Sequence, residues 1–316
     1  MYVGIDLGGT EIKAGLVSDD LNIIRKDKVP TGATRHYSEI IKDMAYLAKK
    51  VVSDAGYDIN KDIKHIGIGS PGACDSENGI LVFAGNLNFD NVPMVEEMKK
   101  HINLPVYIGN DANAAALGEF YMLEDKDVKF MLAVTLGTGV GGGIIINKRI
   151  YEGFNGIAGE LGHFQVMASG GEKCTCGREG CFEAHASVTA LIRETKRAIE
   201  KNPDSLMAKM VEGDLSRVNG KTSFDAMRAG DETAKEVVEN YIRHVGEGIV
   251  SLINIFQPEV VVIGGAISKE GDYLINPVSE IVKKNVFCKS VAQTKIRVSK
   301  LGNDAGIIGA AMLGKK

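Results

Sequence analysis

The sequence predicts an α/β protein in which one unit of strands and helices occurs twice, with a long insertion in the second copy. Three pairs of segments match in the same order: residues 3–17 with 132–146, 66–72 with 261–267, and 109–112 with 302–305. They are, in turn, a β-hairpin with a glycine turn, a strand that ends in glycines, and a GNDA motif before an Ala-rich helix. Colinear matches of this kind predict an internal duplication.

Helices are expected at matching places in both halves. Apolar residues recur every three or four positions over residues 40–52 and 234–256. The second of these helices should end before Pro258, because proline disfavours helical backbone at the residue before it. The second half is longer, and its excess lies between about residues 150 and 225. This insertion contains a cluster of cysteines, so we expect it to carry specificity.

Composition argues against several classes of function. The 316 residues are 44% hydrophobic and 25% charged, an ordinary globular composition, and the net charge of −4 gives no support to nucleic-acid or membrane-surface binding. No apolar run reaches the ~18 residues that a transmembrane helix needs. The N-terminus enters a strand pattern without a signal sequence, so we expect a cytoplasmic protein. In the cytoplasm, clustered cysteines more often bind metal than form disulfides.

Two glycine-rich hairpin turns are candidates for binding phosphate. Residues 6–10 (DLGGT) and 135–142 (TLGTGVGG) each lie between two predicted strands. Exposed amides and Thr hydroxyls in such turns can bind phosphate oxygens, and Asp6 can bind a cation beside them. The second turn also matches G-x-G-x-x-G, but a strand follows it, so it is not a dinucleotide-binding motif, and the sequence has no P-loop. A single glycine hairpin is more often only a turn, whereas two at matching positions favour phosphate binding.

Asp111 is the candidate general base. It follows a predicted strand and precedes an Ala-rich helix, which is also a favourable place for a helix N-cap. We expect capping alone for Asp304, the matching residue of the second copy. Asp111 differs because Asn110 and Asn113 lie beside it and because a cleft is expected between the two halves. A carboxylate at the edge of such a cleft suits a base that activates a hydroxyl nucleophile.

A cysteine cluster predicts a zinc site. Cys174, Cys176 and Cys181 follow one another in a Gly-rich stretch, and His163 lies eleven residues before Cys174. Three thiolates and one imidazole make a closed tetrahedral site of the structural type.

Two glutamates flank this cluster. Glu160 precedes His163 and Glu183 follows Cys181. Alone, each would be interpreted as a solvated surface residue. Close to two zinc ligands, they are expected to converge with the free face of His163 on a polyhydroxylated ligand.

Taken together, these motifs resemble the ROK family of bacterial sugar kinases, within the actin-like, hexokinase-like ATPase superfamily. The resemblance covers almost the whole chain and rests on residues 6–10, 69–72, 109–113, 137–143, 160–163 (ELGH) and 174–183 (CTCGREGCFE). Residues 85–89 (GNLNF) and the chain length look most like the ROK glucokinases. That subfamily more usually has Trp at the position of Phe89 and Leu at the position of Phe182.

The resemblance implies two actin-like (RNase H-like) domains with a cleft between them. The first would consist of residues 1–117 and 303–316, and the second of residues 118–302 with a zinc-containing insertion over about 150–225. It also implies the use of ATP, Mg²⁺ and structural Zn²⁺, and a homodimer or higher homo-oligomer without nucleic-acid or membrane partners.

The resemblance further implies a role for each matching residue. Asp111 would take the proton from the sugar 6-hydroxyl, and Asp6 would help to place Mg²⁺. Sugar-binding residues would be Asn86, Asn110, Asp111, Glu160, His163 and Glu183. The triphosphate would lie against Gly8, Gly9, Thr10, Lys13, Thr138 and Gly139, and the adenosine near Gly264 and Gly265. Zinc would be bound by His163, Cys174, Cys176 and Cys181.

The expected reaction is ATP-dependent phosphorylation of glucose to glucose 6-phosphate, which needs positioning and charge neutralisation more than covalent chemistry. Two alternatives stay open at this point. One is a kinase for another sugar, such as N-acetylmannosamine, N-acetylglucosamine or fructose. The other is a non-enzymatic sugar sensor, since the family includes repressors.

Overall fold

The computed structural model describes residues 1–315, which form two compact units. Among these residues, unit 1 consists of 1–129, 143–159 and 300–315, and unit 2 of Phe130–Gly142 and Glu160–Ser299. Lys316, the last residue of the range expected for the first domain, lies outside the described residues. The units differ from the predicted domains in that residues 118–129, 143–159 and 300–302 cluster with unit 1. The domain boundaries themselves stay a prediction.

The first sheet has the strand order β3-β2-β1-β4-β8. Strands β1, β2 and β3 are antiparallel neighbours, whereas β4 pairs in parallel with both β1 and β8. Their bounds are β1 (Tyr2–Leu7), β2 (Glu11–Val17), β3 (Ile23–Pro30), β4 (Ile66–Ser70) and β8 (Val106–Asn110). The helices of unit 1 are α1 (Tyr37–Ser53), α2 (Met94–Lys99), α3 (Asp111–Tyr121) and α10 (Ala305–Met312), the last preceded by the 3₁₀ turn η4 (Gly302–Asp304).

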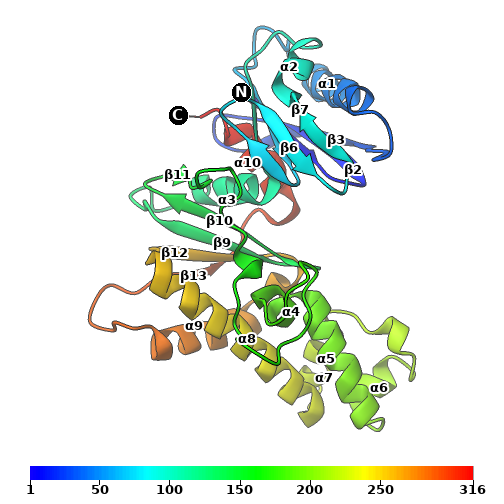
Figure 1. Cartoon of the computed structure of the whole chain (residues 1–316), viewed down its shortest axis with the longest axis vertical. Helices are drawn as coiled ribbons and strands as arrows, with labels where there is room; N and C mark the ends of the chain where they lie inside the picture. Colours follow the sequence, from blue (N-terminus) through cyan, green and yellow to red (C-terminus); the bar gives the residue numbers. More distant parts are fainter. Residues whose placement is uncertain (316) are drawn as a thin grey trace. The chain divides into compact units, whose positions relative to one another are not determined.

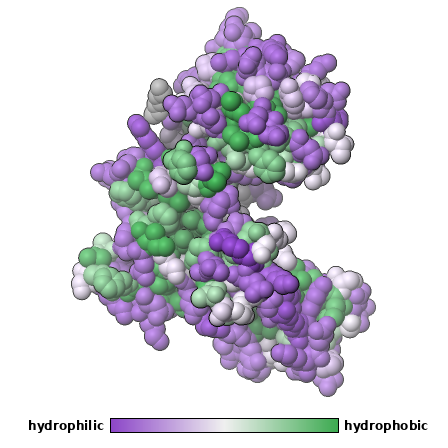
Figure 2. All heavy atoms as spheres, viewed as in Figure 1, coloured by the Kyte–Doolittle hydropathy of each residue, from purple (hydrophilic) through white to green (hydrophobic). Residues whose placement is uncertain are grey.

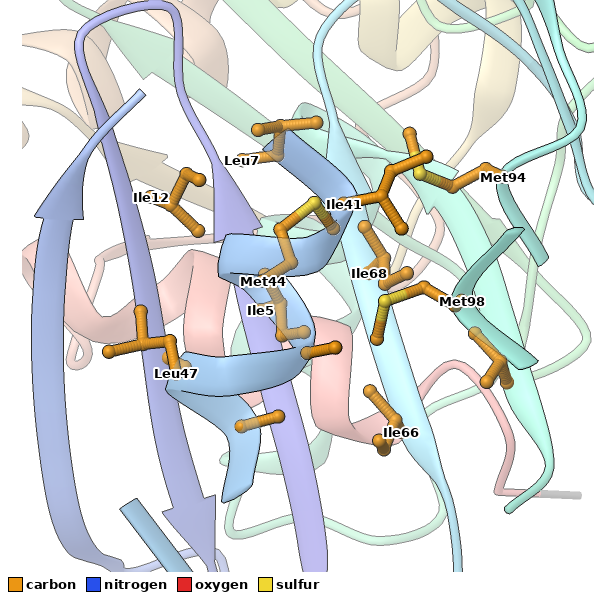
Figure 3. Packing of buried hydrophobic residues seen from close by; sticks show 14 of the residues in the cluster. Ile5, Leu7, Ile12, Ile41, Met44, Leu47, Ile66, Ile68, Met94 and Met98 are labelled. Atoms are coloured by element: carbon orange, nitrogen blue, oxygen red, sulfur yellow. The ribbon is translucent and has the colours of Figure 1, made fainter. Parts of the chain in front are cut away.

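Alternating side chains place helices on both faces of this sheet. Figure 3 shows Ile5 and Ile68 facing the apolar side chains of α1, such as Met44. The intervening residues are glycines that face α10: a Cβ at Gly4 would overlap the carbonyl oxygen of Ile307, and a Cβ at Gly67 that of Ala310. Because strand side chains alternate between faces, the pattern of isoleucine and glycine buries one face under α1 and lets the backbone of α10 approach the other.

A small antiparallel sheet completes unit 1. Its strands are β5 (Ala73–Asp75), β6 (Ile80–Ala84) and β7 (Phe89–Val92), in the order β5-β6-β7. The turn between β6 and β7 contains Asn86, and Phe89 at the start of β7 is buried.

The other large sheet has the order β11-β10-β9-β12-β13, which repeats the first sheet strand for strand. Its strands are β9 (Met131–Leu136), β10 (Val140–Ile146), β11 (Arg149–Ile150), β12 (Val260–Gly264) and β13 (Lys295–Val298). As in the first sheet, the strand after the hairpin, β12, is parallel to both of its neighbours, β9 and β13. The predicted duplication is therefore confirmed at the level of strand order.

Most helices of unit 2 lie in the insertion or follow it, and α4, α5, α7 and α9 pack against α8 (Figure 1). They are η1 (Leu161–His163), α4 (Phe182–Ala186), α5 (Val188–Lys201), α6 (Leu206–Met210), η2 (Leu215–Arg217), α7 (Thr222–Arg228), α8 (Glu232–Phe256), η3 (Ala266–Glu270) and α9 (Asp272–Asn285). Helix α8 ends before Pro258 as predicted, with Gln257 in a left-handed conformation at φ 46°.

Hydrophilic side chains cover most of the molecular face seen in Figure 2. Among residues 1–315, no helix is both long and apolar enough to cross a lipid bilayer.

Candidate active site

The glycine turn of unit 1 lies between β1 and β2. The amide of Gly8 donates to the carbonyl oxygen of Glu11 at 3.0 Å, and the Thr31 hydroxyl donates to the Gly8 carbonyl oxygen at 2.6 Å. These two hydrogen bonds stabilise the backbone of the turn at Gly8. Thr10, at the tip of the turn, is exposed. A Cβ at Gly9 would lie 3.2 Å from Nδ2 of Asn86, so the β6–β7 turn reaches the glycine turn. Asn86, which is predicted to bind the sugar, therefore lies next to the turn that is predicted to bind phosphate.

Two opposite charges flank this turn. Asp6 and Lys13 face each other across β1 and β2, and Lys13 Nζ lies 3.2 Å from Asp6 Oδ2. Gly306 of α10 leaves room for the carboxylate, because a Cβ there would lie 3.1 Å from Asp6 Cγ. The pair offers an ammonium group for phosphate oxygens and carboxylate oxygens of the kind that Mg²⁺ prefers.

Asp111 lies at the same end of the first sheet as Asp6. In the register of the parallel strands Asp6 of β1 pairs with Gly69 of β4, and Gly69 pairs with Gly109 of β8. Asp6 lies near the carboxyl end of β1 and Asp111 directly follows β8, so both carboxylates lie near the carboxyl ends of parallel strands that flank β4. Asp111 is the first residue of α3, is half-buried, and its Oδ1 accepts the amide hydrogen of Ala112 at 2.8 Å. A helix N-terminus is a favourable place for a carboxylate.

The cap of α3 is Asn110 rather than Asp111, because its Oδ1 accepts from the amides of Ala112 at 2.9 Å and Asn113 at 3.1 Å. Its Nδ2 donates to the carbonyl oxygen of Gly72 at 3.0 Å. Both polar atoms of the Asn110 side chain therefore have partners inside unit 1. The sugar-binding role of Asn110 stays a prediction, and its cap explains how the backbone places Asp111 on the first turn of the helix.

The matching glycine turn of unit 2 lies between β9 and β10. The Gly137 carbonyl oxygen accepts from the Val188 amide at 2.8 Å, and the Thr138 carbonyl oxygen accepts from the Thr189 hydroxyl at 2.7 Å. These bonds fix Gly137 and Thr138 against the start of α5.

Strand β12 ends beside this turn, since Gly264 pairs with Thr135 in register. Gly265 adopts φ 86°, and a Cβ there would overlap the Leu136 carbonyl oxygen, so the chain requires glycine at this point. The predicted adenosine residues thus lie at the same end of the second sheet as the predicted phosphate residues Thr138 and Gly139.

The predicted zinc ligands gather in one cluster. Ligand atoms of His163, Cys174, Cys176 and Cys181 all lie within 4.8 Å of one another. His163 Nδ1 is 3.5 Å from Cys174 Sγ, and Cys176 Sγ is 3.6 Å from Cys181 Sγ. A tetrahedron with zinc at the usual distances has N–S and S–S edges of about 3.5 and 3.8 Å. The spacing therefore fits zinc, and it is far longer than the ~2.0 Å of a disulfide.

Charge at the cluster also suits a metal. Hydrogen bonds from the backbone and side chain of Arg178 lower the pKa of the Cys176 thiol to about 6, which favours the thiolate that zinc binds. Burial raises the pKa of the Cys181 thiol, so this cysteine needs a bound cation to lose its proton at neutral pH.

The two ring nitrogens of His163 face different groups. Nδ1 faces Cys174, whereas Nε2 lies 4.0 Å from Oε2 of Glu160, whose side chain is 66% exposed. This arrangement leaves Nε2 and Glu160 together on the side of the ring away from the cysteines, as expected if both contact a polar ligand.

Glu183 is not a solvated surface residue. Its Oε2 accepts from the Val140 amide at 3.0 Å, and its Oε1 accepts from the Thr175 hydroxyl at 2.8 Å. Sequence reasoning missed both contacts, as it missed the anchoring roles of Thr31 and Thr189, because no motif marks a side chain that bonds to a distant turn.

Comparisons with known proteins agree on one family. A model of the ROK family matches residues 2–316. The glucokinase of Halalkalibacterium halodurans is 37% identical over 100% of this chain and 95% of its own length, and that of Thermotoga maritima is 37% identical over 99% and 97%. A solved structure of a ROK family glucokinase from Streptomyces griseus, in complex with glucose and AMPPNP, is similar with a TM-score of 0.79. It is 32% identical and is matched over 99% of this chain and 98% of that one.

Proposed function

The chain belongs to the ROK family, and from this premise we propose that it is a glucokinase, which transfers the γ-phosphoryl group of ATP to the 6-hydroxyl of glucose. Its fold is the two-domain actin-like fold of the solved ROK kinases, as the sequence predicted. The observation that carries most weight is the similarity, over nearly full length, to glucokinases and to a glucokinase solved with glucose and an ATP analogue.

We propose that Asp111 is the general base. Its carboxylate would accept the proton of the sugar 6-hydroxyl as that oxygen forms a bond to the γ-phosphorus and the bond to ADP breaks. The cap made by Asn110 and the bond from the Ala112 amide hold the Asp111 side chain at the end of the sheet. Asn86 supports this arrangement, because it reaches Gly9 of the turn proposed to bind phosphate.

The remaining residues would bind and orient the substrates. Lys13 and the turn residues Gly8, Gly9 and Thr10 would hold phosphate oxygens in unit 1, as Thr138 and Gly139 would in unit 2. Asp6 would hold Mg²⁺, which supplies charge neutralisation on the phosphates when bound. Glu160, His163 and Glu183 would hold sugar hydroxyls, and a structural zinc would fix the loop that carries them.

A panel of sugars tests the substrate. ADP formation should be measured with glucose, mannose, fructose, N-acetylglucosamine and N-acetylmannosamine, and glucose is expected to have the highest kcat/KM. A higher kcat/KM for N-acetylmannosamine or another sugar would show that this sugar, and not glucose, is the preferred substrate. ADP formation with none of them would favour the sensing alternative. A cytoplasmic location and a homo-oligomeric assembly stay predictions.

A further inference from the structure

We propose that Glu183 is a positioning residue for the glycine turn between β9 and β10, and that it joins this turn to the zinc loop, residues 163–181. This role is additional to its expected contact with the sugar. It rests on the proposed function, because the turn is taken to receive phosphate oxygens of ATP.

On one side Glu183 holds the turn itself. Its Oε2 accepts the amide hydrogen of Val140, the first residue of β10 after Thr138 and Gly139. A Cβ at residue 139 would overlap this oxygen, so glycine is needed here for the carboxylate to reach the amide. Hydrogen bonds to an ionised acceptor are about twice as strong as those between neutral groups. The bond therefore fixes one side of the turn.

On the other side Glu183 holds the zinc loop. Its Oε1 accepts the hydroxyl hydrogen of Thr175, which lies between the ligands Cys174 and Cys176. Oε1 also lies 3.6 Å from Cys174 Sγ. A single carboxylate thus connects the metal-binding segment to the turn proposed to bind phosphate.

The backbone of Glu183 is well anchored for this task. The preceding residue, Phe182, is fully buried and its ring lies 5.2 Å from that of Phe164. Gly248 of α8 makes room for the same ring, because a Cβ there would overlap it. The packing of Phe182 in the core therefore fixes the position of the neighbouring Glu183 backbone.

The geometry leaves capacity for a ligand. An ionised carboxylate offers about four lone pairs. Oε2 of Glu183 uses one for the Val140 amide, and Oε1 accepts from the Thr175 hydroxyl and, where Cys174 is protonated, from its thiol, so at least one lone pair of Oε2 stays available. Sugar hydroxyls can bind to Glu183 without displacing Val140 or Thr175. An ordered zinc loop should consequently stabilise the glycine turn between β9 and β10. The affinity for nucleotide should then depend on Glu183 even without sugar.

The test compares the wild type with Glu183→Gln, which keeps one neutral acceptor oxygen but removes the negative charge and the second acceptor. Glu179→Gln serves as the matched control, because it removes an exposed carboxylate from the same loop. Three quantities are measured on zinc-loaded protein without sugar: amide hydrogen exchange of a peptide covering residues 137–142, the Kd of AMPPNP, and the zinc content. For Glu183→Gln we expect exchange about tenfold faster and a Kd about five- to tenfold higher, the effect of replacing a charged hydrogen-bond acceptor by a neutral one. Zinc content should stay at about one per chain.

Unchanged exchange and unchanged AMPPNP affinity in Glu183→Gln would overturn the positioning role, as would an equal effect in Glu179→Gln. If Glu183→Gln does not fold or loses zinc, Thr175→Val decides, because it keeps the carboxylate and the β-branched shape and removes only the hydroxyl. It should also speed exchange at residues 137–142, and unchanged exchange would overturn the proposal. A wild type that binds AMPPNP but does not phosphorylate glucose would contradict the proposed function and not this inference.

Discussion

Asp304 forms a salt bridge with Lys26, in which Nζ lies 2.7 Å from one carboxylate oxygen and 2.9 Å from the other. Sequence matching pairs Asp304 with Asp111 and predicts a helix cap at residue 304. Asp304 is indeed the N-cap residue of α10 by position, but its side chain makes no capping hydrogen bond to the helix. The aspartates of the two GNDA motifs therefore have different contacts. Asp304 is paired with Lys26 of β3 in unit 1.

Asp304→Asn should therefore have little effect. The Asp304 and Lys26 side chains are 35% and 54% exposed, and exposed ion pairs contribute less than about 1 kcal/mol. We expect chemical denaturation to show a loss within this limit and kcat to stay near that of the wild type. A folded Asp304→Asn protein with kcat reduced a hundredfold would contradict the different roles assigned to the two aspartates.

Asp111→Asn is the matching change in the other copy. Asparagine keeps the volume and the hydrogen bond from the Ala112 amide but cannot act as a base. We expect kcat to fall at least ~10²-fold, as for the loss of a general base, while the Kd of glucose measured by calorimetry changes little. Near-normal turnover in Asp111→Asn would show that the proton leaves by another route.

Cys176→Ser tests the zinc site. The variant should lose the ~1 zinc per chain expected for a closed four-ligand site, which metal analysis measures directly. Glu160, His163 and Glu183 lose their support, so glucose KM should rise at least about tenfold, corresponding to two or more hydrogen bonds. ATP KM should rise less, through the link from Thr175 to Glu183. A wild type without zinc, or a variant with unchanged glucose KM, would remove both the metal and its role at the sugar site.

Gly67→Ala tests the close approach of α10 to the first sheet. A Cβ at this position would overlap the Ala310 carbonyl oxygen, and neither backbone can move without disturbing the core. We expect a loss of about 1–3 kcal/mol in the free energy of unfolding, as for other overpacked sites. Gly85→Ala is the control, because its Cβ would meet only the ring of the exposed Phe83 at 3.3 Å. Equal stability of both variants would show that the contact is not tight.

Much of this fold could be predicted because it repeats. Residues 3–17 and 132–146 match without a gap, and the two sheets indeed have the same strand order. The cluster of predicted zinc ligands could be found because their spacing in the sequence is short and the chemistry of Cys and His is specific.

Long-range side-chain contacts could not be found in this way. Glu183 bonds to an amide 43 residues away, and Asp304 pairs with a lysine 278 residues away. Neither partner is marked by a motif. The choice between Asn110 and Asp111 as the cap depends on where β8 ends and helical backbone begins, a difference of one residue that periodicity does not resolve.

The identity of the product tests the proposed reaction most directly. Purified protein is incubated with ATP, Mg²⁺ and glucose, ADP is measured, and glucose 6-phosphate is measured in parallel by its oxidation with glucose 6-phosphate dehydrogenase. We expect one glucose 6-phosphate for each ADP, with both lost in Asp111→Asn. ADP formed without glucose 6-phosphate, or no turnover by a protein that binds both glucose and AMPPNP, would contradict the assignment.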